Sequence, residues 1–284
     1  MAQQRLGRVQ WGDLTFGPGS SYSVTAVSGL DDLPDVRADD VDRPGQHGTY
    51  TGPDYVGART IQMKLGLRGD NPDDLRALTL ALRAATQPQD QPAPLQLLDQ
   101  DTLVYAKVRR RSIPYDAEYL WRIGDAAVEW YCADPHLYGL TEWSASTTAY
   151  SPAAGRSYPL VPPRSYGAQG TSGQISAPNG GAAPAYPLLR VSGPIASPSI
   201  EQPNSGALLV LDVTLQAGEY VLIDTRSRAV LYMGSSPRRS WVRGGSTWPL
   251  LLPGPNTLTF RGSALPGDPG QMSLLTVTWR DTSL

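Results

Sequence analysis

Residues 58–68 read Ala-Arg-Thr-Ile-Gln-Met-Lys-Leu-Gly-Leu-Arg, and from Thr60 onward apolar side chains alternate with polar ones. The apolar side chains that share one side of an extended chain are Ile61, Met63, Leu65 and Leu67. This period of two predicts a half-buried β-strand over 60–67. The preceding stretch 39–48, Asp-Asp-Val-Asp-Arg-Pro-Gly-Gln-His-Gly, predicts a polar, turn-rich loop that leads into the strand.

Similar short alternating segments, separated by Gly and Pro, recur along the chain. The sequence holds 29 Gly and 26 Pro, a composition typical of a mainly β protein with many turns. In the first half, further strands are predicted at 22–28, 103–109, 119–123 and 126–132. In the second half, strands are predicted at 186–192, 207–215, 220–224, 229–233, 256–260 and 273–279, with the spacing of a β-sandwich.

One helix is predicted at about 71–86. Asn71 suits the N-cap, Pro72 suits the first helical position, and two aspartates follow in the first turn. Leu75, Leu78 and Leu82 recur at helical spacing and should face the sheet. Leu80 falls on the opposite face, where an ordinary exposed leucine and a contact with a neighbouring subunit are equally good interpretations.

The length of 284 residues favours two domains. We expect an N-terminal domain at 1–143 and a β-sandwich at 185–284. Between them, 144–184 is rich in Ser, Gly, Pro and Ala and predicts a linker or extended arm that becomes ordered on assembly.

Charge and cysteine content exclude several classes of protein. The net charge of −2 provides no strong field for nucleic acid or anionic membranes. Cys132 is the only cysteine, so no intrachain disulfide can form, and its apolar neighbours predict a buried thiol. The polar, basic residues 1–10 do not resemble a signal peptide, and no apolar run is long enough for a membrane span, so we expect no membrane insertion.

Two parts of the chain resemble the distal tail proteins (Dit) of long-tailed phages. In the first half, the acidic loop 39–48, the "GART" sequence at 57–60 and the turn Ala133-Asp-Pro-His-Leu-Tyr138 are similar to that family. In the second half, landmarks follow in the family's order. They are Gly193-Pro-Ile-Ala-Ser-Pro-Ser-Ile200, Gln216-Ala-Gly-Glu-Tyr-Val-Leu-Ile-Asp-Thr225, Leu252-Pro-Gly-Pro-Asn-Thr-Leu-Thr-Phe260 and Thr276-Val-Thr-Trp-Arg280.

The resemblance implies a fold and a function. It implies an N-terminal sheet or split-barrel domain that builds a ring, with one helix, and a C-terminal galectin-like sandwich. It also implies a structural virion protein: a hexameric ring at the tail tip that connects the tail tube protein to the tail hub and to tail fibres or receptor-binding proteins. Such a protein is made in the cytoplasm of the bacterial host and released in the virion.

Candidate site residues follow from this interpretation. The subunit interface is expected at Asp39, Asp40, Asp42, Arg43, His47 and Leu80. The basic cluster at Lys107, Arg109 and Arg111 could line a ring lumen and meet DNA phosphates without sequence specificity, or pair with acids of an adjacent subunit. Trp241 and Trp248 flank a flexible loop and are candidate sugar or partner contacts, which keeps a carbohydrate-binding module for host attachment as the alternative function.

The sequence points to no enzyme and no cofactor. Two histidines and one cysteine leave few members for a nucleophilic triad, and no Gly-x-Ser-x-Gly elbow exists. The acids of the 39–48 loop, with His47, lack the spacing of a calcium loop, so a metal site is not expected there.

Overall fold

The computed structural model describes residues 7–115, 122–150, 172–263, 265 and 272–284. The chain divides into two units, Met1–Leu140 with Leu284 and Thr141–Ser283. Each unit has its own cluster of buried apolar side chains. The expected strand at 119–123 lies mostly outside the described residues, which resume at Arg122.

The first unit is built on an antiparallel sheet with the order β2-β1-β9-β10-β11-β8-β3, and β12 pairs with β10. The order is an open path that does not close into a barrel among the described residues. The strands are β1 (Val9–Trp11), β2 (Leu14–Phe16), β3 (Tyr22–Ser28), β8 (Arg59–Arg68), β9 (Ala93–Leu97), β10 (Thr102–Ser112), β11 (Arg122–Cys132) and β12 (Leu137–Gly139), with a 3-10 turn η1 (Leu98–Gln100).

Strand β8 confirms the alternation of the sequence. The side chains of Ile61, Met63, Leu65 and Leu67 are buried, and most of those between them are exposed. Trp130 of β11 meets Trp11 and Phe16 edge-on in the same core, at centroid distances of 5.9 and 6.2 Å. Aromatic and aliphatic side chains from several strands thus exclude water from one face of the sheet.

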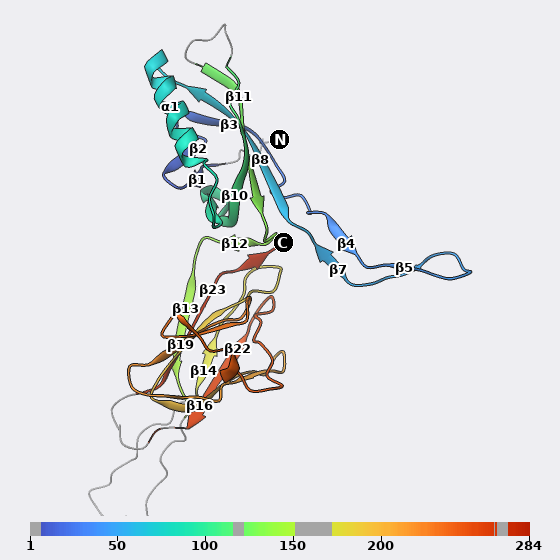
Figure 1. Ribbon diagram of the computed structural model, residues 1–284, viewed down its shortest axis with the longest axis vertical. Helices are drawn as coiled ribbons and strands as arrows, with labels where there is room; N and C mark the ends of the chain where they lie inside the picture. Colours follow the sequence, from blue (N-terminus) through green and yellow to red (C-terminus); the bar gives the residue numbers. More distant parts are fainter. Residues whose placement is uncertain (1–6, 116–121, 151–171, 264, 266–271) are drawn as a thin grey trace, which may run out of the picture. The chain divides into compact units, whose positions relative to one another are not determined.

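Helix α1 (Pro72–Ala85) is the only α-helix among the described residues and covers this buried face (Figure 1). The side chain of Asn71 accepts a hydrogen bond from the Asp74 backbone N–H at 2.9 Å, as expected of an N-cap. Leu75 and Leu82 are buried and Leu78 is partly buried, which confirms the predicted inner face.

A long two-stranded arm is inserted between β3 and β8. It consists of β4 (Val36–Ala38) paired with β7 (Asp54–Val56), and β5 (Val41–Asp42) paired with β6 (Thr49–Tyr50). Because β3 and β8 are themselves paired, the arm continues their hairpin beyond the sheet, as Figure 1 shows. The predicted loop 39–48 is the tip of this arm.

The second unit is a sandwich of two antiparallel sheets. Their orders are β13-β23-β15-β19-β20-β21 and β14-β22-β16-β17, with β18 paired to β16. The strands are β13 (Trp143–Thr148), β14 (Gln174–Ser176), β15 (Leu188–Ser192), β16 (Ile195–Gln202), β17 (Ala207–Val210), β18 (Thr214–Leu215), β19 (Tyr220–Asp224), β20 (Ala229–Tyr232), β21 (Ser236–Pro237), β22 (Thr257–Ser263) and β23 (Leu274–Trp279), with a 3-10 turn η2 (Arg239–Trp241). The short strand β24 (Thr282–Ser283) belongs to neither of these sheets. Both sheets contribute to one core, which includes Phe260 and Trp279.

Two features of this unit differ from the sequence expectation. Both ends of the segment 144–184 belong to the sandwich, since β13 pairs with β23 and β14 pairs with β22; residues 151–171 lie outside the described part. Strand β16 was not expected because Pro198 lies within it. The strand accommodates this proline at an irregularity in its pairing with β22 between Ala196 and Ser199, as prolines in sheets require.

Candidate functional site

The tip of the arm brings together five of the expected interface residues. The backbone N–H of Arg43 donates to the carbonyl of Gly48 at 3.1 Å and closes the turn. The Arg43 guanidinium lies 4.8 Å from the centre of the Tyr50 ring, and a carboxylate oxygen of Asp40 accepts from the Gly52 N–H at 2.9 Å. The five residues, all exposed on the arm, are Asp39, Asp40, Asp42, Arg43 and His47.

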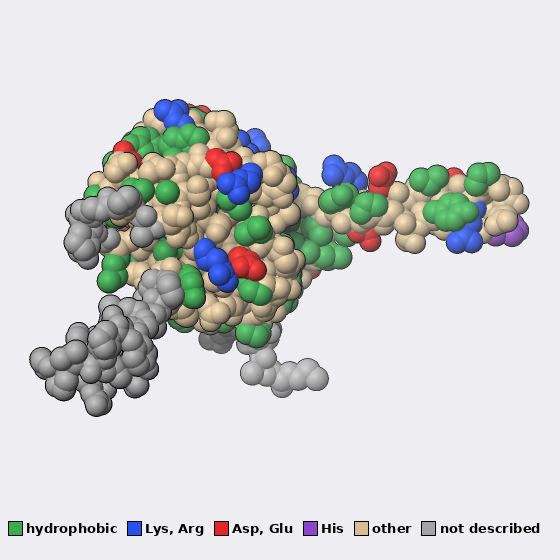
Figure 2. All heavy atoms as spheres, turned by 90° about the horizontal axis from the view of Figure 1, so that it is seen from below, with side chains coloured by type: hydrophobic (Ala, Val, Ile, Leu, Met, Phe, Trp, Pro, Cys, Tyr) green, Lys and Arg blue, Asp and Glu red, His purple; other side chains and the backbone are tan. Residues whose placement is uncertain are grey.

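The arm exposes apolar as well as polar side chains. Leu33 is 69% exposed and Val41 is 62% exposed, and Tyr50 and Tyr55 are also exposed. Figure 2 shows apolar side chains beside charged ones along the arm. A two-stranded ribbon has no core of its own and is at best marginally stable in water. Exposed apolar side chains grouped on a surface are a common feature of sites that another molecule covers.

The arm and its base are acidic. Residues 31–57 contain seven aspartates and two arginines, a formal net charge of −5, and four of these aspartates with both arginines lie in the ribbon 36–56. Among the residues that the structure describes, no group of His, Cys, Asp and Glu side chains is placed to hold a metal ion.

A buried arginine fastens the base of the arm. The side chain of Arg59, only 2% exposed, opens β8 directly after the arm. Its guanidinium donates to the carbonyls of Gly29 (3.1 Å), Leu30 and Asp32 (2.8 Å) before the arm, and to that of Pro135 (3.0 Å) after β11. Burial lowers the pKa of Arg59 from its ordinary value. This role was not predicted from the sequence.

The structure does not bring the basic cluster onto one face. Lys107 pairs with Tyr131 on the outer face of the sheet, where the Arg109 guanidinium lies 4.7 Å from the Tyr131 ring centre. A bulge between Val108 and Arg110 then shifts the register, so that Arg111 pairs with the buried Val128.

Arg111 consequently reaches the helix side of the sheet. Its guanidinium donates to the carbonyl of Arg83 at 2.9 Å and to Oγ1 of Thr86 at 2.8 Å, at the C-terminal end of α1. A cation at this end complements the helix dipole. Arg110, opposite Glu129, lies on the outer face of the sheet with Lys107, which also donates to the carbonyl of Asp90.

The two remaining expected contacts differ in their exposure. Leu80 on α1 is 55% exposed and leaves an apolar side chain in solvent. Trp241 and Trp248 are partly buried and pack against the sandwich core. The guanidinium of Arg239 lies 4.3 Å from the Trp248 ring centre, and that of Arg238 lies 5.7 Å from Trp241. These contacts leave the two rings less open to a stacked sugar.

Cys132 and His136, whose side chains could react chemically, lie in environments typical of structural residues. Cys132 is buried, and burial raises its pKa to about 12, which keeps it a thiol at neutral pH. His136 Nδ1 lies 2.6 Å from Asp134 Oδ1, and the other carboxylate oxygen accepts from the Tyr138 hydroxyl at 2.5 Å. In the described part of the chain, no helix combines the length and apolar character that crossing a membrane requires.

Comparisons with known proteins give a consistent picture. No curated protein sequence matches the chain significantly. Among solved structures, the Dit protein of phage SPP1, described as a paradigm of the hub of the adsorption apparatus in phages that infect Gram-positive bacteria, matches with a TM-score of 0.64 at 16% identity, covering 93% of this chain and 94% of that one. A chain of the phage p2 baseplate in its activated conformation with Sr matches with a TM-score of 0.52 at 10% identity, covering 95% and 96%. These likenesses show a shared fold.

Two family models match the sequence. Residues 18–132 match the phage tail protein RIFT-related domain, and residues 180–280 match the C-terminal domain of the siphovirus-type tail component. The first range contains the arm and Arg59, whose hydrogen bonds clamp the base of the arm, and the second contains most of the sandwich. The chain is therefore a member of the Dit family of siphovirus tail proteins, a structural component of the phage tail and baseplate carried in the virion.

Proposed function

We propose that this protein forms a closed ring, most simply of six copies, at the distal end of a phage tail. The observation that carries the proposal is the arm, an acidic ribbon with exposed apolar side chains and no core of its own. If the arm of one copy binds the next copy, it must contact a surface there that differs from the arm itself. Such head-to-tail contacts generate a ring when the rotation between subunits closes.

The interface of the proposed ring includes Asp39, Asp40, Asp42, Arg43 and His47 at the arm tip, and Leu80 on α1 is a second candidate contact. Lys107 and Arg109, with Arg110, form a basic outer face of the sheet that could border a channel and meet DNA phosphates as they pass. The proposed neighbours are the tail tube protein on one side and the tail hub, with fibres or receptor-binding proteins, on the other. The role is structural and includes no catalytic step.

The test is the mass of the full chain in solution by light scattering, with negative-stain images of the same peak. The matched variant replaces residues 36–56 with a short glycine-containing turn and keeps Arg59 and both strands of the sheet hairpin. We expect a ring of about six chains from the wild type and a monomer with an unchanged melting temperature from the variant. Rings of the same mass from both proteins would remove the arm from the interface.

A further inference from the structure

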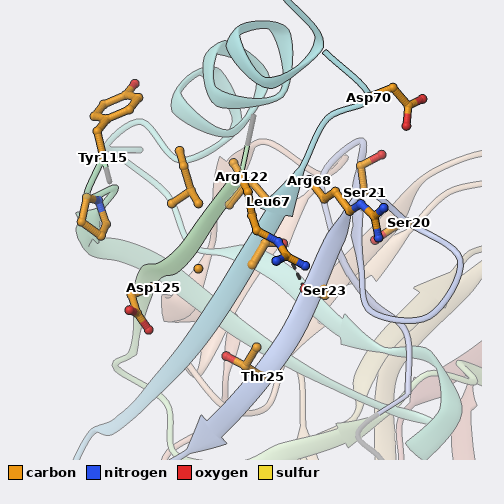
Figure 3. A pocket seen from close by; sticks show the side chains of 14 residues that line it. Ser20, Ser21, Ser23, Thr25, Leu67, Arg68, Asp70, Tyr115, Arg122 and Asp125 are labelled. Carbon is orange, nitrogen blue, oxygen red and sulfur yellow. Dashed lines mark hydrogen bonds between the residues drawn. The ribbon is translucent and has the colours of Figure 1, made fainter. Parts of the chain in front are cut away.

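A groove lies at one end of the sheet of the first unit. It is lined by the last residues of β8 and by the first residues of β3 and β11. Its volume is about 1000 Å³. Two arginines lie in its middle, Arg68 from β8 and Arg122 from β11, and Figure 3 shows both side chains reaching over the sheet surface. Hydroxyl groups border them at Ser20, Ser21, Ser23 and Thr25.

The two arginines form a like-charge pair that the unit does not neutralise. Arg68 and Arg122 are direct cross-strand partners, an arrangement that is unfavourable for equal charges. Among the described residues, neither guanidinium has an ion pair or a hydrogen bond. Asp70 and Asp125 also line the groove, but they lie toward its opposite ends in Figure 3. The middle of the groove is thus a place for carboxylates from another molecule.

The groove and the arm occupy opposite ends of the same strand. Strand β8 starts at Arg59, where the arm joins the sheet, and ends at Arg68 in the groove. At the rise of a strand this separation is about 30 Å. The arm extends the hairpin away from the groove (Figure 1), so its acidic tip is directed away from the arginines of its own chain. A donor surface and an acceptor surface at opposite ends are what a head-to-tail contact between copies requires.

We propose that the Arg68–Arg122 groove receives the acidic arm tip of a second copy of this chain. The carboxylates of Asp39, Asp40 and Asp42 would lie between the two guanidinium groups and accept charge-assisted hydrogen bonds from them. This inference rests on the proposed ring function and specifies where the arm of each subunit binds. It also accounts for the two surfaces together, since each supplies the charge that the other lacks.

Disulfide trapping in the full chain tests the contact even when it is weak. Ser21→Cys in the groove and Asp42→Cys on the arm are combined, and the native Cys132 does not interfere because it is buried. Mild oxidation is expected to give a ladder of covalent multimers on a non-reducing gel. The matched control combines Ser21→Cys with Asp13→Cys, an exposed aspartate outside the arm, and should stay monomeric.

Charge reversal in the cysteine background then tests the arginines. Arg68→Glu with Arg122→Glu should abolish the ladder, and adding Asp39→Lys with Asp40→Lys should restore it. Restoration also shows that the reversed protein is folded. A wild-type yield of multimers after reversal, or cross-linking no greater than in the Asp13→Cys control, would overturn the proposal.

The ring function can be separated from this contact. If shortening the arm abolishes the ring but reversal of the two arginines does not, the ring proposal stands and the groove is not the binding site of the arm. If reversal instead lowers the affinity of the protein for a duplex DNA probe and leaves the ladder intact, the groove faces nucleic acid and the proposal is also overturned.

Discussion

The guanidinium of Arg59 donates from Nε to the carbonyl oxygen of Pro135 at 3.0 Å and so joins the start of β8 to the turn after β11. The same group donates to three carbonyls that precede the arm. Four backbone acceptors around one buried cation fix where the arm leaves the sheet, and the buried carbonyl of Leu30 would lose its partner without the guanidinium.

Replacing Arg59 with Met should therefore destabilise the first unit and loosen the arm. We expect a loss of roughly 3 kcal/mol, the cost of unpairing one buried and three partly buried carbonyls. Urea unfolding gives the stability change, and limited proteolysis within 31–57 reports the arm. The neighbouring exposed Thr60→Ala provides the control. Unchanged stability and an unchanged cleavage rate would contradict the role of the clamp.

The bulge in β10 predicts different effects for three adjacent arginines. Arg111→Ala removes the hydrogen bonds to the end of α1 and should cost about 1–2 kcal/mol. Arg109→Ala and Arg110→Ala leave the helix untouched and should each change the stability by less than about 0.5 kcal/mol. Chemical denaturation of the three variants is the measurement, and equal losses at all three positions would argue against the register shift.

Substitutions at Leu80 and Leu82, on the same helix, distinguish an effect on assembly from an effect on folding. Leu82 is fully buried, so Leu82→Ala should destabilise the unit by about 2–5 kcal/mol. Leu80→Glu changes an exposed side chain and should leave the melting temperature unchanged. If Leu80 contacts a neighbouring subunit, its substitution should lower the mass measured by light scattering. A wild-type mass would remove Leu80 from the interface.

Glu219 in the sandwich predicts a pH-dependent stability. The Tyr232 hydroxyl donates to one carboxylate oxygen at 2.6 Å and the Gln216 N–H donates to the other at 2.7 Å, and these bonds lower the pKa of Glu219 below its ordinary value of 4.5. The stabilisation is thus complete above pH 4.5 and is lost as the pH falls through the lowered folded-state value.

Thermal melts between about pH 3 and pH 7 test this dependence. The difference in melting temperature between the wild type and Glu219→Gln should be largest at neutral pH and should shrink in acid. Tyr232→Phe, which removes the principal hydrogen bond, should show a weaker pH dependence than the wild type. A difference between wild type and Glu219→Gln that grows in acid would reverse the assigned sign.

Local patterns in the sequence were sufficient for the helix and for many of the core strands, but not for short strands such as β1, β2 and β9 or for the strands of the arm. The alternation in 60–67 and the capping residues of α1 act within a few neighbours, so both were predicted closely. Strand β16 was missed because a proline in its middle argues against a strand, and its bulge depends on a partner strand far along the chain.

The candidate site required three-dimensional information. The acidic arm tip was identified from composition, but its extent as a ribbon depends on pairing between 36–42 and 49–56. Arg59 carries a signal that could have been noticed, since it has the same parity as Ile61, Met63 and Leu65 and therefore points toward the core. The separation of Arg111 from Arg109 follows from one bulge, which the sequence does not indicate.

The arm continues an existing hairpin, and this has a consequence for how such proteins can diverge. Removing or adding matched residues on both strands of the arm leaves the pairing of β3 with β8 and the clamp at Arg59 in place. The reach of the arm can therefore change between related phages while the fold of the first unit stays the same. In the proposed ring, the diameter and the choice of partner would then depend on the length of one insertion and not on the hydrophobic core.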